Sequence, residues 1–358
     1  MPDTQLRRNL AEELVSAGAL YSPEWMAAFE EVPRHLFVGE FVIRTQEGLT
    51  HYSAERHEEW LNAVYSDQGL LTQFSQGESN ATSSSSQPSV MAAMLEALNL
   101  ADGDTVLEIG SGTGYNAALL SHRLGSENVI SVDIDPALVE AASEHLRQAG
   151  FTTTVAAGNG RDGYPDAAPY SAIIATCSVQ RIPVAWLAQV KDGGRIVANI
   201  GAVLLAFDVK GGQAIGRPLS IQAMFMALRE TAEKQEPVGH LAAPPTQARI
   251  TRLRIKEAVF TSASFRDFLL LLHPAMEHIA FGADLHMINC PAEESAAWID
   301  ISTGTVSEVG SRSPWRLLAG AYEQWDAMGQ PELMDLRLSI DEEGNHFIDR
   351  TGYESVAI

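Results

Sequence analysis

The residues best suited to chemistry lie in a glycine-rich segment and in an acid that follows it about twenty residues later. The segment LEIGSGTGYNAALL (107–120) has the pattern of a buried strand, a glycine turn and a helix. Such a turn lets backbone N–H groups approach a ligand closely, because glycine has no side chain. Asp133, at the end of the next apolar run, suits hydrogen bonding to ribose hydroxyls. The combination predicts a site for a nucleoside-containing cofactor.

Two common glycine fingerprints do not fit this segment. The dinucleotide fingerprint needs glycine at its sixth position, which is Tyr115 here, and a P-loop needs a following Gly-Lys-Ser/Thr. The spacing of Gly110, Gly112 and Gly114, with Glu108 before them, instead resembles motif I of S-adenosylmethionine-dependent methyltransferases. This resemblance implies S-adenosyl-L-methionine as the cofactor.

A second segment rich in polar groups is the serine run at residues 83–86, which precedes Pro88 and the apolar helix VMAAMLEALNL (90–100). A serine run is often a flexible linker. Its position also favours a loop that leads into the helix and offers hydroxyl and backbone N–H groups. Both interpretations stay open at this point, and Ser86 can also cap the helix.

Short apolar strands alternate with amphipathic helices from residue 105 to about residue 218. The predicted strands are 105–109, 129–133, 153–156, 171–176 and 195–200. Asp135 and Pro136 predict the N-cap and first turn of one intervening helix. Buried strands that alternate with helices are typical of a parallel sheet with right-handed crossovers. We therefore expect a doubly wound, Rossmann-like α/β methyltransferase sheet.

The chain divides into three regions by composition. Residues 1–80 contain helical patterns and form the predicted N-terminal, substrate-side region, and residues 81–218 form the cofactor-binding core. Residues 219–358 predict a smaller α+β extension, for substrate recognition or oligomerisation. Within it, AAPP (242–245) predicts a turn or linker, and residues 248–260 alternate like a strand.

Composition excludes several classes of partner. The chain has 24 Lys+Arg against 46 Asp+Glu, so its net charge of −22 disfavours nucleic acid and anionic membranes. No apolar run reaches the ~18 residues of a membrane span, and the N-terminus lacks the apolar core of a secretion signal, so we expect a cytoplasmic protein. Two cysteines cannot form a Cys-rich zinc site or a disulfide framework, and His273 and His278 lack metal-ligand spacing, so no metal is predicted.

Several segments, within residues 5–218, resemble the protein-L-isoaspartate O-methyltransferase family. They are NLAEELVSAGAL (9–20), AFEEVPRHLFV (28–38), AVYSD (63–67), SQP (86–88), motif I, AAGNGRDGYPDAAPYSAIIATCSVQRIP (156–183) and VKDGGRIVANIGA (190–202). The resemblance implies methylation of a carboxylate in an isomerised aspartate, with an isoaspartyl protein or peptide as substrate.

The resemblance also implies site residues. Ser86 would lie beside the substrate carboxylate and the transferred methyl, with Ser85 as support, and these two are the catalytic candidates. The cofactor-binding candidates are Glu108, Gly110, Ser111, Gly112, Gly114, Tyr115, Asp133, Ile134, Asn159 and Gly160. The substrate-binding candidates are Ser83, Ser84, Cys177, Ser178 and Arg181. Cys177 could equally be a small buried apolar residue and Arg181 a solvated one. At the position of Asn159 the family carries an aspartate, which accepts a hydrogen bond from adenine N6. The side-chain carbonyl of Asn159 can also accept this hydrogen bond, but it carries no charge.

Three departures from the family concern the substrate. The segment before the serine run is longer and begins QGLL (68–71), the loop at 177–181 is CSVQR, and about 140 residues follow the core. Chains with these features resemble methyltransferases associated with ribosomally made lanthipeptides, which implies a modified precursor peptide as substrate. General isoaspartate repair and a non-catalytic cofactor-binding adaptor are the alternatives, and the oligomeric state stays open.

The predicted reaction needs little catalytic machinery. An aspartyl carboxyl group has a reference pKa near ~3.9 and is already ionised at neutral pH, so no general base is needed. Alignment of acceptor and donor, with partial removal of water from the carboxylate, then accounts for catalysis.

Overall fold

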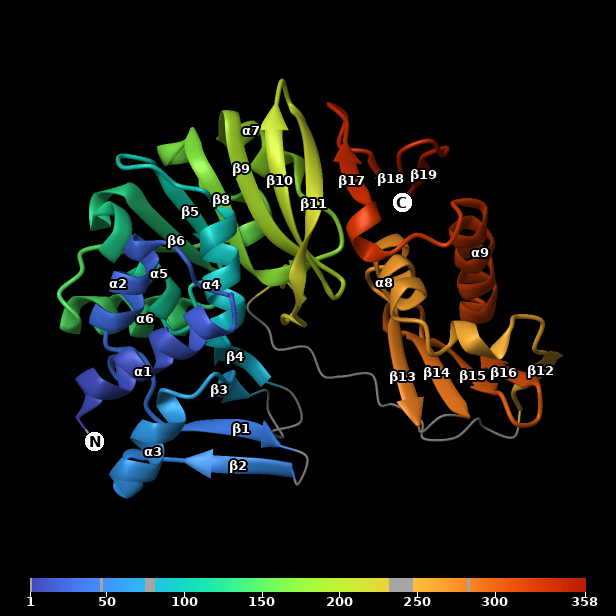
Figure 1. Cartoon of the computed structure of the whole chain (residues 1–358), viewed down its shortest axis with the longest axis horizontal. Helices are drawn as coiled ribbons and strands as arrows, with labels where there is room; N and C mark the ends of the chain where they lie inside the picture. The colour runs from blue at the N-terminus through green and yellow to red at the C-terminus, as the bar shows by residue number, and fades with distance from the viewer. Residues whose placement is uncertain (1, 46–47, 75–80, 232–246, 282–283) are drawn as a thin grey trace.

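The computed structural model describes residues 2–45, 48–74, 81–231, 247–281 and 284–358, which form three sheets with surrounding helices (Figure 1). The turn or linker predicted at 242–245 lies outside these residues. In the described ranges, no helix combines the length and the apolar character that crossing a bilayer requires.

The largest sheet has ten strands and confirms the predicted α/β class. Its parallel part runs in the order β9-β8-β5-β6-β7 and comprises β5 (Val106–Ile109), β6 (Val129–Asp133), β7 (Thr154–Ala157), β8 (Tyr170–Val179) and β9 (Val190–Ile200). The connecting helices include α4 (Pro88–Ala97), α5 (Tyr115–Leu124), α6 (Pro136–Gln148) and α7 (Val184–Gln189). The order places β5, which leads into the glycine turn, at the centre of the parallel part.

Five antiparallel strands extend this sheet beyond β9. They are β10 (Val203–Lys210), β11 (Gln213–Gln222), β17 (Arg337–Ile340), β18 (His346–Asp349) and β19 (Val356–Ala357). The last three come from the predicted C-terminal extension. Segments far apart in sequence therefore share one sheet.

Apolar residues alternate between the two faces of the sheet. Leu107 and Ile173 belong to one buried cluster, with α7 and α8 (Ala263–Leu272). Val106 and Ile174 belong to the other, with α4, α5, α1 (Asp3–Ser16) and α2 (Pro23–Glu31). The sheet is thus covered by helices on both faces, as near-continuous apolar strands require.

The N-terminal region adds a four-stranded antiparallel sheet of order β2-β1-β3-β4. Its elements are β1 (Phe41–Thr45), β2 (Gly48–Tyr52), α3 (His57–Val64), β3 (Leu70–Phe74) and β4 (Ala81–Ser85). Most of the serine run is therefore a strand, and both earlier interpretations were wrong for residues 83–85. The serine run is a strand because it pairs with β3, with Leu70 opposite Ser85 and Leu71 opposite Ser84. The local strand propensity of the serines does not reveal this pairing.

The C-terminal segment forms a five-stranded antiparallel sheet with two helices, as the predicted α+β extension requires. The elements are β12 (Arg249–Arg252), β13 (Glu277–Phe281), β14 (Leu285–Cys290), β15 (Ser295–Asp300), β16 (Thr305–Val309), α8 and α9 (Pro314–Ala327). The strand expected over residues 248–260 ends at Arg252, and the helix α9 was not predicted. Short 3₁₀ helices are Arg34–Leu36, Ala54–Arg56, Ser126–Asn128, Gly160–Asp162, Pro165–Ala167, Glu257–Val259, Pro291–Glu293 and Leu333–Asp335.

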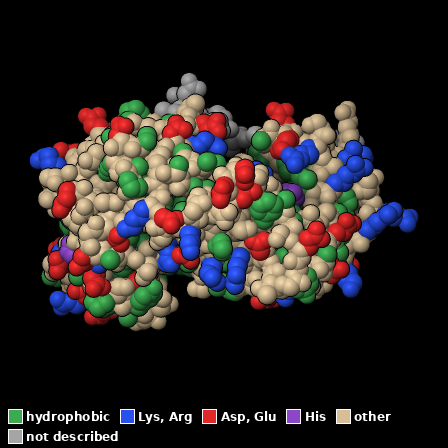
Figure 2. All heavy atoms as spheres, turned by 90° about the horizontal axis from the view of Figure 1, so that it is seen from above, with side chains coloured by type: hydrophobic (Ala, Val, Ile, Leu, Met, Phe, Trp, Pro, Cys, Tyr) green, Lys and Arg blue, Asp and Glu red, His purple; other side chains and the backbone are tan. Residues whose placement is uncertain are grey.

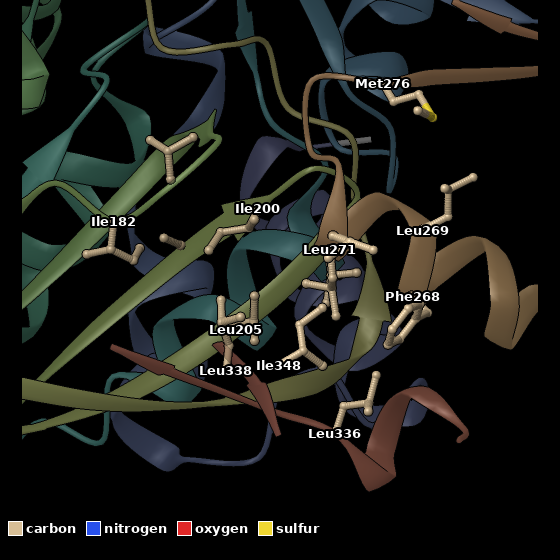
Figure 3. Close-up of a cluster of buried hydrophobic side chains, with 14 of the residues drawn as sticks. Ile182, Ile200, Leu205, Phe268, Leu269, Leu271, Met276, Leu336, Leu338 and Ile348 are labelled. Atoms are coloured by element: carbon tan, nitrogen blue, oxygen red, sulfur yellow. The ribbon is translucent and has the colours of Figure 1, made fainter. Parts of the chain in front are cut away.

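A continuous apolar cluster joins this segment to the main sheet. Figure 3 shows α8 side chains beside strands of the sheet and the returning C-terminal strands: Phe268, Leu269, Leu271, Ile200, Leu205, Leu338 and Ile348. The extension thus packs directly on the ten-stranded sheet.

Candidate active site

The glycine turn between β5 and α5 lies against two other elements. Gly110 has a φ of +98°, and a Cβ there would lie 2.7 Å from the Thr176 Oγ1 atom at the end of β8. Gly112 has a φ of +50°, and a Cβ there would lie 3.3 Å from the Ser84 carbonyl oxygen. Glycine is therefore required at both positions by backbone conformation and by space. The turn is an open cradle with the serine strand on one side.

Asp133 holds the cradle from the end of β6. Its Oδ2 atom accepts a 3.0 Å hydrogen bond from the Gly112 N–H, and its Oδ1 atom accepts a 3.1 Å bond from the Asp135 N–H. Each carboxylate oxygen can accept a second bond, so both remain able to receive hydroxyl donors. Ile134 beside it is half-buried. Asp135 accepts from the Ala137 N–H at 3.0 Å, which confirms its predicted N-cap role.

Glu108 and Ser111 are bonded inside the protein. The fully buried Glu108 carboxylate accepts from Asn116 Nδ2 at 2.7 Å and from Ser131 Oγ at 2.5 Å. Ser131 Oγ also lies 2.7 Å from Ser111 Oγ. Burial, with a smaller contribution from the charge of Asp133, raises the pKa of Glu108 to about 7. These side chains support the glycine turn from the interior of the protein, so the backbone of the turn can face a ligand.

The Tyr115 ring lies in the N-terminal apolar core. It makes edge contacts with Phe29, tilted contacts with Phe37, and lies under the Arg34 guanidinium at 5.7 Å. Burial raises the pKa of its hydroxyl. The side chain of Tyr115 fills the space between α5 and the N-terminal helices. If Tyr115 contacts the cofactor, as predicted, it does so through its backbone.

The serine run meets the cradle through one face of β4. Ser83 is 4% exposed, and its Oγ atom has no hydrogen-bond partner among the described residues. That oxygen lies 3.7 Å from the position of a Cβ on Gly112. A buried hydroxyl without a partner is costly in a folded protein, so this oxygen is available to a ligand in the cradle. Ser84 presents its carbonyl oxygen to the same glycine, and Ser86 is half-buried at the entrance to α4.

Arg34 connects the serine run to the segment after α3, and sequence reasoning did not single it out as a functional residue. Its fully buried guanidinium donates to the carbonyl oxygens of Val64, Ser66, Gln68, Ser85 and Ser86 and to Ser85 Oγ. Burial lowers the pKa of Arg34 to about 10, so the group stays charged at neutral pH. The only sequence signal was its place in the Val-Pro-Arg segment that resembles the family.

Gln73 and Thr176 are two further site residues that sequence reasoning missed. Gln73 reaches from β3 and donates to Asp135 Oδ2 at 3.3 Å. Thr176 Oγ1 lies 2.6 Å from the Gly110 carbonyl oxygen and 3.1 Å from the Ile109 carbonyl oxygen. Neither residue belongs to a recognisable pattern, since each acts through a contact between elements distant in the chain.

The end of β7 brings Asn159 and Gly160 to the same edge of the sheet. Asn159 Oδ1 accepts from the Arg161 N–H at 3.0 Å. A Cβ on Gly160 would lie 2.5 Å from Ile109 Cγ2 and 2.9 Å from Leu228 Cδ1. Gly160 is therefore packed between β5 and a later segment of the chain, which leaves no room for a side chain.

Residues 223–230, which we call the strap, lie along this edge. The Ser178 N–H donates to the Met226 carbonyl and the Leu228 N–H donates to the Ser178 carbonyl, both at 2.8 Å. An ion pair of 3.3 Å between Arg161 and Glu230 ties its end to the turn after β7. The strap had no recognisable sequence signal.

The remaining predicted substrate residues differ in their surroundings. Cys177 is half-buried and packs against the apolar cluster beneath α7 and α8, and burial, with the charge of Asp133, raises the pKa of its thiol to about 12, which disfavours a reactive thiolate. Ser178 is bonded to the strap and to the Gly201 carbonyl. Arg181 is exposed, in line with the solvated alternative, and it also donates to the backbone carbonyl of Ile358.

These observations fit the cofactor that motif I implied. The cradle of 110–114 would hold the amino-acid part, Asp133 the ribose hydroxyls, and Asn159 and Gly160 the adenine. The buried Ser83 hydroxyl, which has no partner among the described residues and lies 3.7 Å from the position of a Cβ on Gly112, is the feature of this chain that a bound group would use.

Comparison with known proteins identifies the family. The family model "Protein-L-isoaspartate(D-aspartate) O-methyltransferase (PCMT)" matches residues 5–231. The protein-L-isoaspartate O-methyltransferase of Ignicoccus hospitalis is 36% identical over 196 residues, covering 54% of this chain and 81% of the relative. That of Methanoculleus marisnigri is 34% identical over 201 residues, covering 56% and 79%.

A solved structure named protein-L-isoaspartate O-methyltransferase has the same fold, with a TM-score of 0.60 and 23% identity over 96% of this chain and 99% of that one. The fold likeness therefore includes most of the C-terminal extension. Methyltransferases of this family depend on S-adenosyl-L-methionine. The family model covers more than half of the chain, and the chain belongs to the protein-L-isoaspartate(D-aspartate) O-methyltransferase family.

Proposed function

We propose that this methyltransferase esterifies an aspartyl or isoaspartyl carboxylate in a ribosomally made, enzymatically modified peptide of the lanthipeptide kind. The observation that carries the carboxylate assignment is the serine strand held against a glycine cradle. Such a peptide would meet the enzyme in the cytoplasm, the location proposed here.

The proposed roles of the chain's residues follow from their positions. When bound, S-adenosylmethionine supplies a methyl group already activated by a sulfonium. Ser86 is proposed to hold the acceptor carboxylate, with Ser85 in support, while the cradle and Asp133 fix the other reactant. Because the carboxylate is ionised at neutral pH, the residues have only to orient it and displace part of its water.

The ester is expected to rearrange after release. The backbone nitrogen that follows the aspartate attacks the ester carbonyl, the new C–N bond closes a five-membered succinimide, and the nitrogen's proton leaves with methoxide as methanol. The peptide therefore first gains one CH₂ and then ends one water lighter than it began, so each step is visible by mass. A methyl ester that persists without imide would contradict spontaneous closure.

The proposed peptide substrate rests on the departures from the family. The serine run and the segment that begins at Gln68 separate this chain from the pattern that it otherwise resembles. We propose that residues 1–80 form the substrate side, residues 81–218 bind the cofactor, and residues 219–358 recognise the peptide or mediate oligomerisation.

General isoaspartate repair is the second candidate function. The curated relatives reported above carry the repair-type name, and the solved structure of that name matches the extension as well as the core. An extension alone therefore does not favour a special substrate, and the two candidates must be separated by turnover.

Incubation with methyl-labelled S-adenosylmethionine separates the candidates. One panel contains short isoaspartyl peptides of varied sequence, and the other contains cyclised and linear forms of a lanthipeptide precursor with aspartate. Turnover of the cyclised peptide alone supports the proposal, and broad turnover of isoaspartyl peptides supports repair. Binding of S-adenosylhomocysteine without any turnover would indicate an adaptor.

Substitution tests the assigned centre. Ser86→Ala is expected to lower kcat at least tenfold while S-adenosylhomocysteine still binds, because the hydroxyl that orients the carboxylate is lost. Ser143→Ala is the matched control, since Ser143 bonds only its own helix, at the Val139 carbonyl. Unchanged turnover of Ser86→Ala would remove Ser86 from the active centre without affecting the family assignment.

A further inference from the structure

The guanidinium of Arg34 is fully buried on the proposed substrate side, and its hydrogen bonds to the described residues all go to uncharged oxygens. Nη1 donates to Val64 O at 2.8 Å and to Ser66 O at 3.2 Å. Nη2 lies 3.1 Å from Gln68 O. Burying a charge without a counter-ion costs desolvation free energy, which the hydrogen bonds of Arg34 have to offset.

The same guanidinium fixes the junction between β4 and α4. Nε lies 3.3 Å from Ser85 Oγ, and Nη2 lies 3.4 Å from the Ser85 carbonyl oxygen and 2.9 Å from the Ser86 carbonyl oxygen. Two consecutive peptide groups therefore turn their carbonyls toward one cation. The planar fork of arginine can do this, whereas a lysine ammonium can donate only three bonds from one point.

These two carbonyl directions determine where the N–H groups point. A trans peptide group is planar, so its N–H points opposite to its C=O. The peptide that carries the Ser85 carbonyl carries the Ser86 N–H, and the next carries the Gln87 N–H. Both N–H groups therefore point away from Arg34. Gly69 lies beside the second one, since a Cβ there would lie 3.9 Å from the Gln87 nitrogen, in van der Waals contact.

We propose that Arg34 is a positioning residue for the acceptor carboxylate: it holds the 85–87 backbone so that the N–H groups of Ser86 and Gln87 face the carboxylate beside the Ser86 hydroxyl. The proposal rests on the proposed function, because it places the acceptor at Ser86. The positive charge of Arg34 lies on the carbonyl side of these two peptide groups. Their dipoles therefore favour an anion on the opposite, N–H side.

The experiment compares Arg34→Lys with the wild-type chain and with Arg195→Lys. Arg195 also donates to a backbone carbonyl, that of Ala97, and it pairs with Asp208 away from the site. Arg34→Lys is expected to reduce kcat/KM for the acceptor peptide at least tenfold, to leave the Kd of S-adenosylhomocysteine within twofold, and to speed amide hydrogen exchange at residues 84–87. Arg195→Lys is expected to change none of these.

Two results would overturn the proposal: unchanged acceptor kinetics in a folded Arg34→Lys, or equal losses of acceptor turnover and S-adenosylhomocysteine affinity, which indicate a general role in the fold. If Arg34→Lys does not fold, Gly69→Ala decides. Its added methyl group partly covers the Gln87 N–H, so KM for the acceptor should rise severalfold with cofactor affinity unchanged, and an unchanged KM contradicts the proposal. Hydrogen exchange needs no turnover, so a wild-type chain inactive on all peptides defeats the proposed function separately.

Discussion

Some residues of the candidate site form the proposed contact surface for the cofactor, and others support these residues from the interior. Gly110 and Gly112 make the close approach of three elements possible, while Glu108 lies behind them with its carboxylate bonded internally. The glycines and Asp133 could be predicted from sequence, because positive φ values and an acid at a strand end have fixed positional signatures. Arg34, Gln73 and Thr176 could not, because their partners come from distant parts of the chain.

Gly110 gives the first prediction at this scale. Gly110→Ala should weaken S-adenosylhomocysteine binding at least tenfold by calorimetry, because the methyl group would overlap Thr176 Oγ1 at 2.7 Å as well as strain a φ of +98°. Gly150→Ala is the matched control, since its φ is +88° but nothing lies within 4 Å of the added carbon. Equal loss of affinity in both variants would show that conformation alone, and not the contact, matters.

Glu108 gives a prediction for pH. Its folded-state pKa of about 7 lies above the ordinary value of 4.5, so the folded chain binds this proton more tightly than the unfolded chain does. The free energy of unfolding should therefore fall as pH rises from about 4.5 to about 7, by up to about 3 kcal/mol, and then level off. Glu108→Gln should remove this fall in urea titrations. A variant that keeps the wild-type slope would contradict the assignment.

Among the elements, the strand β4 lies against the cradle and the strap lies against Ser178 and the turn after β7. Neither could be predicted, since β4 becomes a strand only through pairing with β3 and the strap is ordered by its bonds to Ser178. The strands β5 to β9 were predictable because each contains a mostly apolar run, although β9 begins at Val190 and not at the predicted residue 195. The helix α9 was not predictable in this way, because it follows short strands in a region where strands and helices do not alternate regularly.

Leu228 tests the strap. Leu228→Ala should weaken S-adenosylhomocysteine binding severalfold, because the leucine packs on Gly160 at the proposed adenine position and its loss leaves a gap. Met224→Ala is the control within the same strap, since Met224 is 88% exposed. Calorimetric affinities that do not differ between the two variants would separate the strap from the cofactor site.

At the scale of the whole molecule, the cofactor-binding sheet and the C-terminal segment form one body. β17 pairs with β11 through Ala214, Ile215 and Gly216, and the cluster of Figure 3 joins α8 to the sheet. Figure 2 shows acidic and basic side chains interspersed over the face seen from above, in a chain with a net charge of −22. The sequence division at residue 218 indicated where the alternating pattern stops, but no local pattern predicts that later strands return to the same sheet.

A fragment of residues 1–231, the range of the family match, tests this unity. The fragment should melt at a lower temperature than the full chain and self-associate in size-exclusion chromatography, because it exposes the edge of β11 and the apolar surface beneath α8. The full chain at the same concentration is the control. A monomeric fragment with an unchanged melting temperature would show that the extension is an independent domain.

The return of β17 to β11 has a consequence for biosynthesis. Residues 223–336 separate the two paired strands, and β18 and β19 follow β17 near the end of the chain. Long-range pairing of this kind forms slowly, and a nascent chain emerges from the ribosome N-terminus first. The sheet therefore cannot reach its full width until residues 356–357 of β19 have been synthesised, and until then the nascent polypeptide carries an unpaired edge that chaperones or early self-association would meet.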